Sequence, residues 1–170
     1  MSKSNTIGIV GGLGPYASMD TAEKVFLNTI ANKDQDHLPL IMISRPCDIP
    51  DRSSYLLGKT KVNPAYEIIE IIKELENAGA NIIGIPCNTA HALPIMSVIS
   101  NDLRERKSKV VLINMVDEVI KFITNYYPEV KRVGVLSSLG TYISGLYRES
   151  LTEAGYDAVF PSEYDQYHKI

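Results

Sequence analysis

Short apolar runs of strand length alternate along this chain with segments of helical periodicity, and this alternation constrains the fold most strongly. The runs are continuous rather than alternately polar, as expected of parallel strands buried on both faces. They lie at residues 6–10, 40–43, 81–85, 110–113, 133–136 and 158–160. The pattern predicts an α/β fold, in which helices cover both faces of a parallel sheet.

Local signals mark where the helices begin and end. Pro15 suits the first turn of a helix that follows the first strand. Asn63 and Pro64 start a second helix, and Gly79 ends it. Residues 45–60 contain two prolines and no periodicity, so they predict a long loop of the kind that often forms a functional lid.

The opening strand and its glycine turn recur late in the chain. Residues 7–14 read Ile-Gly-Ile-Val-Gly-Gly-Leu-Gly, and residues 133–140 read Val-Gly-Val-Leu-Ser-Ser-Leu-Gly. The similarity indicates two copies of one α/β lobe. The alternative is chance, because buried parallel strands are generally rich in Val, Ile and Gly.

Composition and charge limit the classes of function. A chain of 170 residues forms about one domain or two small lobes. Its net charge of −3, without basic runs, argues against a nucleic-acid partner. No apolar run approaches the roughly 18 residues of a membrane span, and the first residues show no signal-peptide profile. We therefore expect no membrane partner, a cytoplasmic location and two cysteines that stay free thiols.

Three polar turns should meet where ligands bind in open α/β sheets, beyond the carboxyl ends of the strands. They are residues 11–15, 86–91 and 137–141, and the loop at 45–53 should join them. The first turn fits the G-x-G-x-x-A dinucleotide pattern, but no acidic residue follows the second strand, so a dinucleotide is disfavoured. Gly12 in this turn serves either an anion-binding backbone cradle or simply a tight turn.

Cys87 carries the strongest chemical signal. It directly follows a buried strand and, from the sequence, starts the next helix, where the helix dipole would favour a thiolate. Asn88 and Thr89 add hydrogen-bond donors beside it. An isolated cysteine is more often a small apolar core residue, but this position and these neighbours favour function. His91, four residues on, is either functional or a capping residue behind the site.

Other candidate residues give weaker signals. Cys47, between Pro46 and Asp48, is interpreted as an incidental thiol. Two cysteines and three histidines show no paired ligand spacing, so no metal site is expected. Arg52 would suit a carboxylate through its planar guanidinium, although a loop arginine is more often simply solvated.

Four segments together resemble the pyridoxal-independent aspartate/glutamate racemase superfamily, and within it the aspartate racemases. Residues 9–15 resemble the opening G-G-M-G-P turn, and residues 49–53 resemble the I-P-D-R-T segment. Residues 86–91 are identical to the P-C-N-T-A-H motif, and residues 140–145 resemble the G-T-x-x-S-G segment. The resemblance covers nearly the whole chain.

This resemblance implies a racemase with two thiols and no cofactor or metal. One cysteine, as thiolate, removes the α-proton of an amino acid, and a second cysteine on the opposite lobe returns a proton to the other face. Cys87 matches the first cysteine. The resemblance further implies substrate contacts from Arg52, Asn88, Thr89, Ser138 and Thr141, with Asp117 near the missing thiol. The residue arguments above add Gly12 as a substrate contact and His91 as a residue behind the site.

The chain departs from the family pattern where the second cysteine should lie. No G-C-T-E motif is present, and the spacing from residue 7 to Cys87, applied from Val133, would place it near residue 213. We therefore expect a first lobe at 1–100 and an incomplete second lobe at 101–170, from either a fragment or a natural short form. Such a chain should not racemise alone and should form a homo-oligomer such as a dimer.

Three functions stay open at this point. The first is a racemase of aspartate or glutamate. The second is a single-cysteine isomerase or decarboxylase of a dicarboxylate, which would need only Cys87. The third is a non-catalytic protein that binds acidic amino acids. Exchange of the substrate α-proton in heavy water separates the three.

Overall fold

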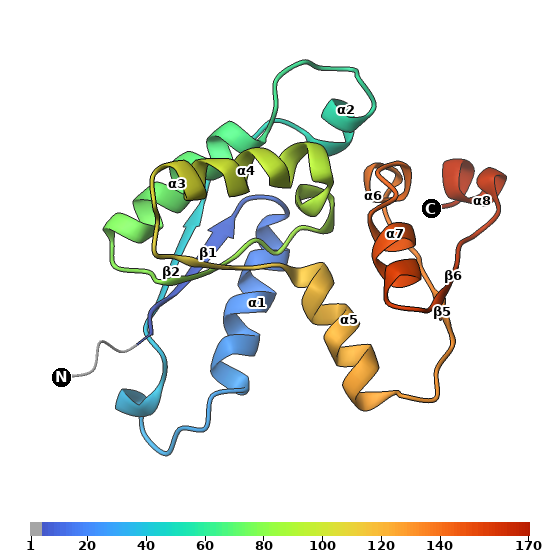
Figure 1. Ribbon diagram of the computed structural model, residues 1–170. Coiled ribbons are helices and arrows are strands. Elements are labelled where there is room, and N and C mark those ends of the chain that lie inside the picture. The colour runs from blue at the N-terminus through green and yellow to red at the C-terminus, as the bar shows by residue number, and fades with distance from the viewer. Residues whose placement is uncertain (1–4) are drawn as a thin grey trace.

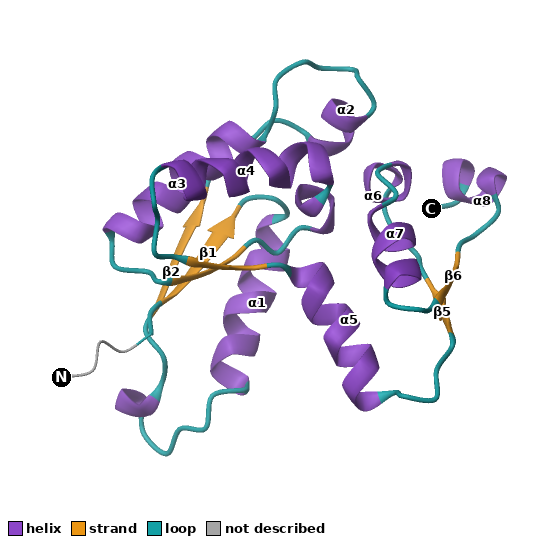
Figure 2. Cartoon of the chain, in the orientation of Figure 1, coloured by secondary structure: helices purple, strands orange, loops and turns teal. Residues whose placement is uncertain are grey.

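The computed structural model describes residues 5–170, and it confirms the predicted α/β fold (Figures 1 and 2). Four parallel strands form the main sheet in the order β2-β1-β3-β4. These strands are β1 (Ile7–Gly11), β2 (Leu40–Ser44), β3 (Ile82–Gly84) and β4 (Val111–Ile113). Two further strands, β5 (Arg132–Gly134) and β6 (Asp157–Val159), pair in parallel as a separate sheet. All six strands lie within two residues of the predicted runs.

Helices lie on both faces of the main sheet (Figure 1). One face carries α3 (Ala65–Asn77) and α4 (Leu93–Glu105), and the other faces α1 (Pro15–Leu27) and α5 (Met115–Tyr126). No helix within residues 5–170 is both long and apolar enough to cross a membrane.

The hydrophobic core lies between the sheet and the pair α3 and α4. Ile68 and Ile72 of α3 and Ile95 of α4 are fully buried against Val10 and Ile83 of the sheet. The predicted start of α3 is confirmed, because the Asn63 side chain accepts a hydrogen bond from the Ala65 N–H at 2.9 Å. The spacing of apolar residues in α3 places one continuous apolar stripe against the core.

The opposite face of the sheet is covered less completely. Val111 and Met42 keep 55% and 39% of their surface exposed. In each strand the two neighbouring residues pack against the core. Because successive side chains of a strand point to opposite faces, Met42 and Val111 point toward the side of α1 and α5. Each of these two helices fully buries only one residue, Ser18 in α1 and Val116 in α5. An apolar surface is therefore left open between them.

The second part of the chain, from β5 onward, repeats the strand–helix–strand connection of the first residues with shorter elements. The strands β5 and β6 are joined through α6 (Leu139–Ile143) and α7 (Leu146–Glu153), as β1 and β2 are joined through α1. A final helix, α8 (Glu163–His168), follows β6. The predicted boundary near residue 100 falls inside α4, and β4 after it joins the main sheet. The division of the chain into domains stays a prediction.

The predicted long loop contains one short helix. α2 (Arg52–Leu56) begins at Asp51, whose side chain accepts a hydrogen bond from the Ser54 N–H at 2.7 Å. The same hydrogen bonds, with the neighbouring cations, lower the pKa of the Asp51 carboxyl. A helix of five residues is too short to produce a periodic pattern, which explains why the sequence did not indicate it. A 3-10 turn, η1 (Asp34–Asp36), lies before β2.

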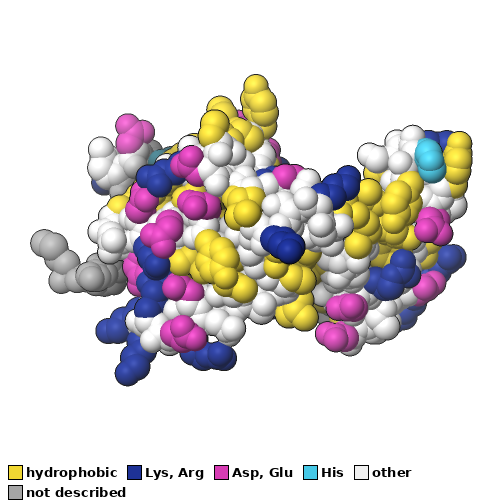
Figure 3. Space-filling model, turned by 90° about the horizontal axis from the view of Figure 1, so that it is seen from above, with side chains coloured by type: hydrophobic (Ala, Val, Ile, Leu, Met, Phe, Trp, Pro, Cys, Tyr) yellow, Lys and Arg dark blue, Asp and Glu magenta, His cyan; other side chains and the backbone are white. Residues whose placement is uncertain are grey.

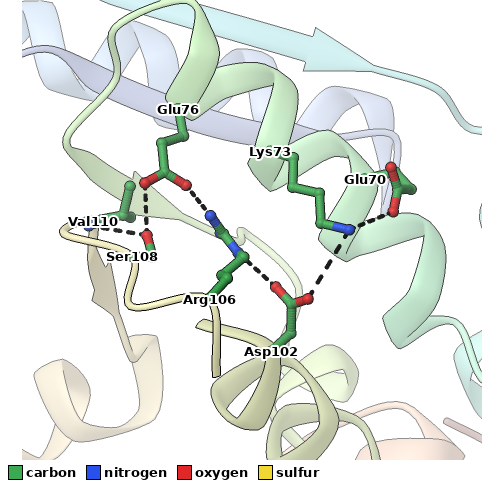
Figure 4. Close-up of polar contacts among 7 residues, drawn as sticks. All are labelled: Glu70, Lys73, Glu76, Asp102, Arg106, Ser108 and Val110. Carbon is green, nitrogen blue, oxygen red and sulfur yellow. Dashed lines mark hydrogen bonds and ion pairs between the residues drawn. The ribbon is translucent and has the colours of Figure 1, made fainter. Parts of the chain in front are cut away.

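A network of charged side chains joins α3 to the end of α4 (Figure 4). Arg106 pairs with Glu76 of α3 and with Asp102 of α4, where Nε lies 2.7 Å from Oδ2. The Ser108 hydroxyl donates to Glu76 at 2.8 Å. Burial alone would raise the pKa of the Glu76 carboxyl, but the hydrogen bonds from Arg106 and Ser108 outweigh it and the pKa is lowered. The network links the two core helices near their C-terminal ends.

Candidate active site

A pocket of about 550 Å³ lies where the main sheet meets the second part of the chain. One wall is the turn after β3, and the opposite wall is the turn after β5 together with α6 and α7. Apolar side chains of α5 form part of the lining. The polar lining residues are Cys87, Asn88, Thr89, Ser137, Ser138, Thr141 and Tyr147.

Cys87 is the one thiol that lines this pocket among residues 5–170. It is half-buried, and its N–H donates to the Ile85 carbonyl at 2.8 Å. A 3-10 turn, η2 (Asn88–His91), follows it, and α4 begins only at Leu93. The expectation that Cys87 starts an α-helix is therefore wrong, because the chain tightens into one 3-10 turn first. The argument from a helix dipole no longer applies to this thiol.

Three hydroxyl groups meet across the pocket wall. Thr89 Oγ1 lies 2.8 Å from Thr141 Oγ1 and 3.2 Å from Ser138 Oγ. Gly140 permits this approach, since a Cβ there would lie 2.4 Å from Ser53 Oγ and 2.9 Å from Thr89 Cγ2. The contact of α2 with η2 and α6 brings the predicted 45–53 loop to this edge, as expected.

Tyr147 and Asn88 form a second link across the pocket. The Tyr147 hydroxyl, on α7, donates to Asn88 Oδ1 at 2.5 Å. Burial raises the pKa of the Tyr147 phenol, so the group stays protonated and can donate. The Asn88 side chain is otherwise exposed toward the pocket and solvent.

His91 lies behind the pocket and is only 3% exposed. Its Nε2 accepts the Met115 N–H at 3.3 Å, so Nδ1 carries the proton and donates to the Cys87 carbonyl at 2.9 Å. Burial lowers the pKa of His91, although the backbone contacts to Cys87 and Ile113 and the charge of the nearby Asp117 act in the other direction. The ring thus ties the turn that carries Cys87 to the first residue of α5.

Three other predicted site residues do not line the pocket. Gly12 has a φ of +93°, and a Cβ there would lie 2.7 Å from Pro46 N, so close packing by itself requires glycine. Arg52 makes only a long contact to the Pro50 carbonyl, at 3.4 Å, and its buried Nε has no hydrogen-bond partner within residues 5–170. Asp117 lies exposed on the first turn of α5.

The sequence analysis missed Tyr147. The residue follows the Gly140–Gly145 segment by two positions, which was a signal for its place near the turn after β5. Its partner Asn88 is 59 residues away, and only the folded topology brings the two together.

The arrangement suits a small polar ligand. A thiol, an amide and several hydroxyls converge on a pocket with apolar walls, which is typical of small-molecule sites. Across residues 5–170, no group of three His, Cys, Asp or Glu side chains is placed to hold a metal ion.

Comparison with known proteins gives one family and several related structures. The family model described as Asp/Glu/hydantoin racemase matches residues 10–168. The broad specificity amino-acid racemase RacX of Bacillus subtilis (strain 168) is 27% identical over 164 residues, which are 94% of this chain and 66% of that protein. Picrophilus torridus aspartate racemase superposes with a TM-score of 0.77 at 31% identity, over 96% of this chain and 65% of that one.

A third similarity concerns the fold alone. An aspartate racemase homologue from Pyrococcus horikoshii OT3 superposes with a TM-score of 0.69 at 23% identity, over 95% of this chain and 66% of that one. The chain therefore spans slightly less than two thirds of the length of each of these three relatives.

Proposed function

This chain belongs to the Asp/Glu/hydantoin racemase family, and we propose that its pocket binds aspartate or glutamate with Cys87 as an acid/base toward the α-carbon. The observation that carries the proposal is the position of the thiol. Cys87 shares the pocket with the amide of Asn88 and the hydroxyls of Thr89, Ser138 and Thr141. These groups can bind the carboxylate and amino group of an α-amino acid while the sulfur approaches the α-carbon.

The proposed proton transfer needs no cofactor. The Cys87 thiolate takes the α-proton, so an S–H bond forms as the C–H bond breaks, and the electron pair moves into the carboxylate. Donors beside the carboxylate stabilise the charge that develops there, which is usually the largest catalytic contribution in such reactions. Return of the proton from the same sulfur restores the starting enantiomer. Inversion requires a second donor on the opposite face.

The 170 residues supply one thiol at the pocket. Cys47 is exposed in the loop after β2 and does not line it. We therefore propose that the chain alone exchanges the α-proton of an acidic amino acid without racemising it. The single thiol also keeps the binding alternative open, in which the pocket holds the amino acid and no exchange occurs.

Two measurements on the whole chain test this function. L-Aspartate should slow the alkylation of Cys87 by iodoacetamide and leave that of Cys47 unchanged, so Cys47 is an internal control. Equal effects on both cysteines would contradict binding at the pocket.

The second measurement follows L-aspartate in heavy water by NMR and chiral chromatography. Exchange with retention supports the one-thiol proposal, and binding without exchange supports the binding protein. Release of carbon dioxide would identify a decarboxylase. Racemisation in the common enzyme range of about 1 to 1,000 per second would overturn the one-thiol proposal.

A further inference from the structure

We propose that Tyr147 is a positioning residue that fixes the Asn88 side chain as a hydrogen-bond donor toward a carboxylate bound beside Cys87. The inference rests on the proposed function and adds which group of the ligand faces which residue. It also assigns a role to the one tyrosine that lines the pocket within residues 5–170.

The direction of the hydrogen bond is the first observation. The Tyr147 hydroxyl donates to Asn88 Oδ1 at 2.5 Å. An asparagine amide has one acceptor oxygen and two N–H donors. With Oδ1 engaged by Tyr147, the amide nitrogen is the group left for a ligand, and it makes no hydrogen bond to any residue from 5 to 170.

The second observation is that no other hydrogen bond orients the Asn88 side chain within residues 5–170. Its neighbour Thr89 is buried and held by the hydroxyls of Ser138 and Thr141. Asn88 is exposed, and Tyr147 is its hydrogen-bond partner across the pocket. Without the phenol, the amide would be free to rotate and present its oxygen instead.

The consequence is a defined orientation for the bound amino acid. An NH₂ group matches the oxygens of a carboxylate and repels an ammonium group. The hydroxyls of Thr89, Ser138 and Thr141 can donate or accept, so they remain available to the ammonium group. Tyr147 thereby selects the orientation in which the ligand carboxylate meets Asn88.

The test compares Tyr147→Phe with Tyr156→Phe. Each change removes one hydroxyl of the second part of the chain, and Tyr156 contacts Thr124 of α5 at 2.9 Å without lining the pocket. The first readout needs no ligand: the side-chain amide signals of Asn88 in a ¹H–¹⁵N spectrum, assigned by their loss in Asn88→Ala. Tyr147→Phe should shift these signals, and Tyr156→Phe should not. Unmoved signals in folded Tyr147→Phe would overturn the inference.

The second readout is the L-aspartate concentration that half-protects Cys87 from iodoacetamide. Tyr147→Phe should raise it about tenfold, as expected for a weakened hydrogen bond to a charged group. In the Asn88→Ala background the same change should add less than twofold, because Tyr147 acts through Asn88. A full tenfold effect in that background would mean that Tyr147 contacts the ligand itself, and the positioning role would be wrong.

Failure of the proposed function gives a different result. L-Aspartate would then leave the alkylation of wild-type Cys87 unchanged, whereas the Asn88 signals would still respond to Tyr147→Phe. Acetate would replace L-aspartate as the carboxylate probe, followed through the Asn88 amide signals. A shift of those signals by acetate in the wild type, weakened in Tyr147→Phe, supports the inference; an equal response in both chains overturns it.

Discussion

His91 uses both ring nitrogens to hold the turn that carries Cys87. One nitrogen donates to the Cys87 carbonyl, and the other accepts the Met115 N–H, an arrangement that only the neutral ring can make. Because burial lowers the pKa of His91 below its ordinary value near 6.5, the unfolded chain binds the proton first as the pH falls. The contribution of His91 to the free energy of unfolding is fully present above its ordinary pKa near 6.5. It is lost as the pH falls through the lower pKa of the folded state.

We predict that the free energy of unfolding declines between pH 7.5 and 5.5, by at most about 1.4 kcal/mol per pH unit from this residue. His91→Asn should cost about 1–3 kcal/mol at pH 7.5, because the Met115 N–H loses its acceptor, and should flatten the decline. Urea unfolding at several pH values measures both effects. The exposed His168→Asn is the control, and an equal pH slope in wild type and His91→Asn would refute the assignment.

Arg52 makes no ion pair within residues 5–170 and keeps a buried Nε without a partner. Arg52 does not line the pocket, but its helix α2 contacts η2 and α6 at the pocket edge. We predict that Arg52→Ala weakens the binding of aspartate at least tenfold and that of alanine little, because only aspartate carries a second carboxylate for the guanidinium. Calorimetric titration with both amino acids tests the difference. Arg104→Ala, on the exposed end of α4, is the control. Equal losses for both ligands would make Arg52 a structural residue.

Residues that are adjacent in sequence were the easiest to predict at this site. Cys87, Asn88 and Thr89 follow one strand, so their place in the pocket required only the rule that ligands bind at the carboxyl ends of strands. Ser138 and Thr141 lie in the turn at 137–141 that was expected at the same sheet edge, and the family resemblance implied their contact with the substrate. Predicting the Tyr147 contact required the packing of α7 against the opposite wall, which no local pattern specifies.

The pairing of α3 with α4 depends on packing and on the charged network at their ends. Arg106 lies between Glu76 and Asp102, and its side chain is 25% exposed. We predict that Arg106→Met lowers the free energy of unfolding by about 1–3 kcal/mol, because Glu76 loses its charged donor. Lys121→Met removes the same charge from an exposed pair with Glu118 and should leave stability nearly unchanged. Urea midpoints compare the two variants, and equal midpoints would contradict the role given to the network.

The main strands and helices were predictable because the apolar pattern and the length of each segment indicate the same type of element. Short apolar runs marked each strand, and the stripe on α3 marked its buried face. Short elements such as α2 and η2 escaped, since four or five residues carry no period. The turn at η2 also changed the expected setting of Cys87, because local hydrogen bonding decides between a 3-10 turn and an α-helix start.

The molecule as a whole presents more surface than its mass predicts. Its accessible surface is 10473 Å², against roughly 8,300 Å² for a compact chain of 18.8 kDa. Exposed apolar residues lie both on the second part of the chain and on the side of α1 and α5. Figure 3 shows them gathered over the second part of the chain, where Ile143, Tyr164 and Tyr167 are exposed. On the opposite side, the exposed residues include Leu27 of α1 and Phe122 of α5.

We predict that the chain self-associates through the α1 and α5 side, since the extra surface exceeds the roughly 800 Å² that each partner buries in a standard interface. Sedimentation velocity at rising concentration should show species larger than 18.8 kDa. The double change Leu27→Glu and Phe122→Glu should shift the equilibrium toward monomer. Val62→Glu, in the exposed loop before α3, is the control. A monomer at all concentrations would contradict the prediction.

The long reach of the contacts across the pocket has a consequence for the timing of synthesis. Thr89 and Asn88 meet partners that lie 49 to 59 positions later in the chain. At about 5–20 residues per second, Cys87 leaves the ribosome several seconds before Tyr147 does. During that interval the thiol has only one wall of its pocket. A nascent chain is thus exposed to oxidants at the very sulfur that the finished protein needs, and translation speed sets the length of that exposure.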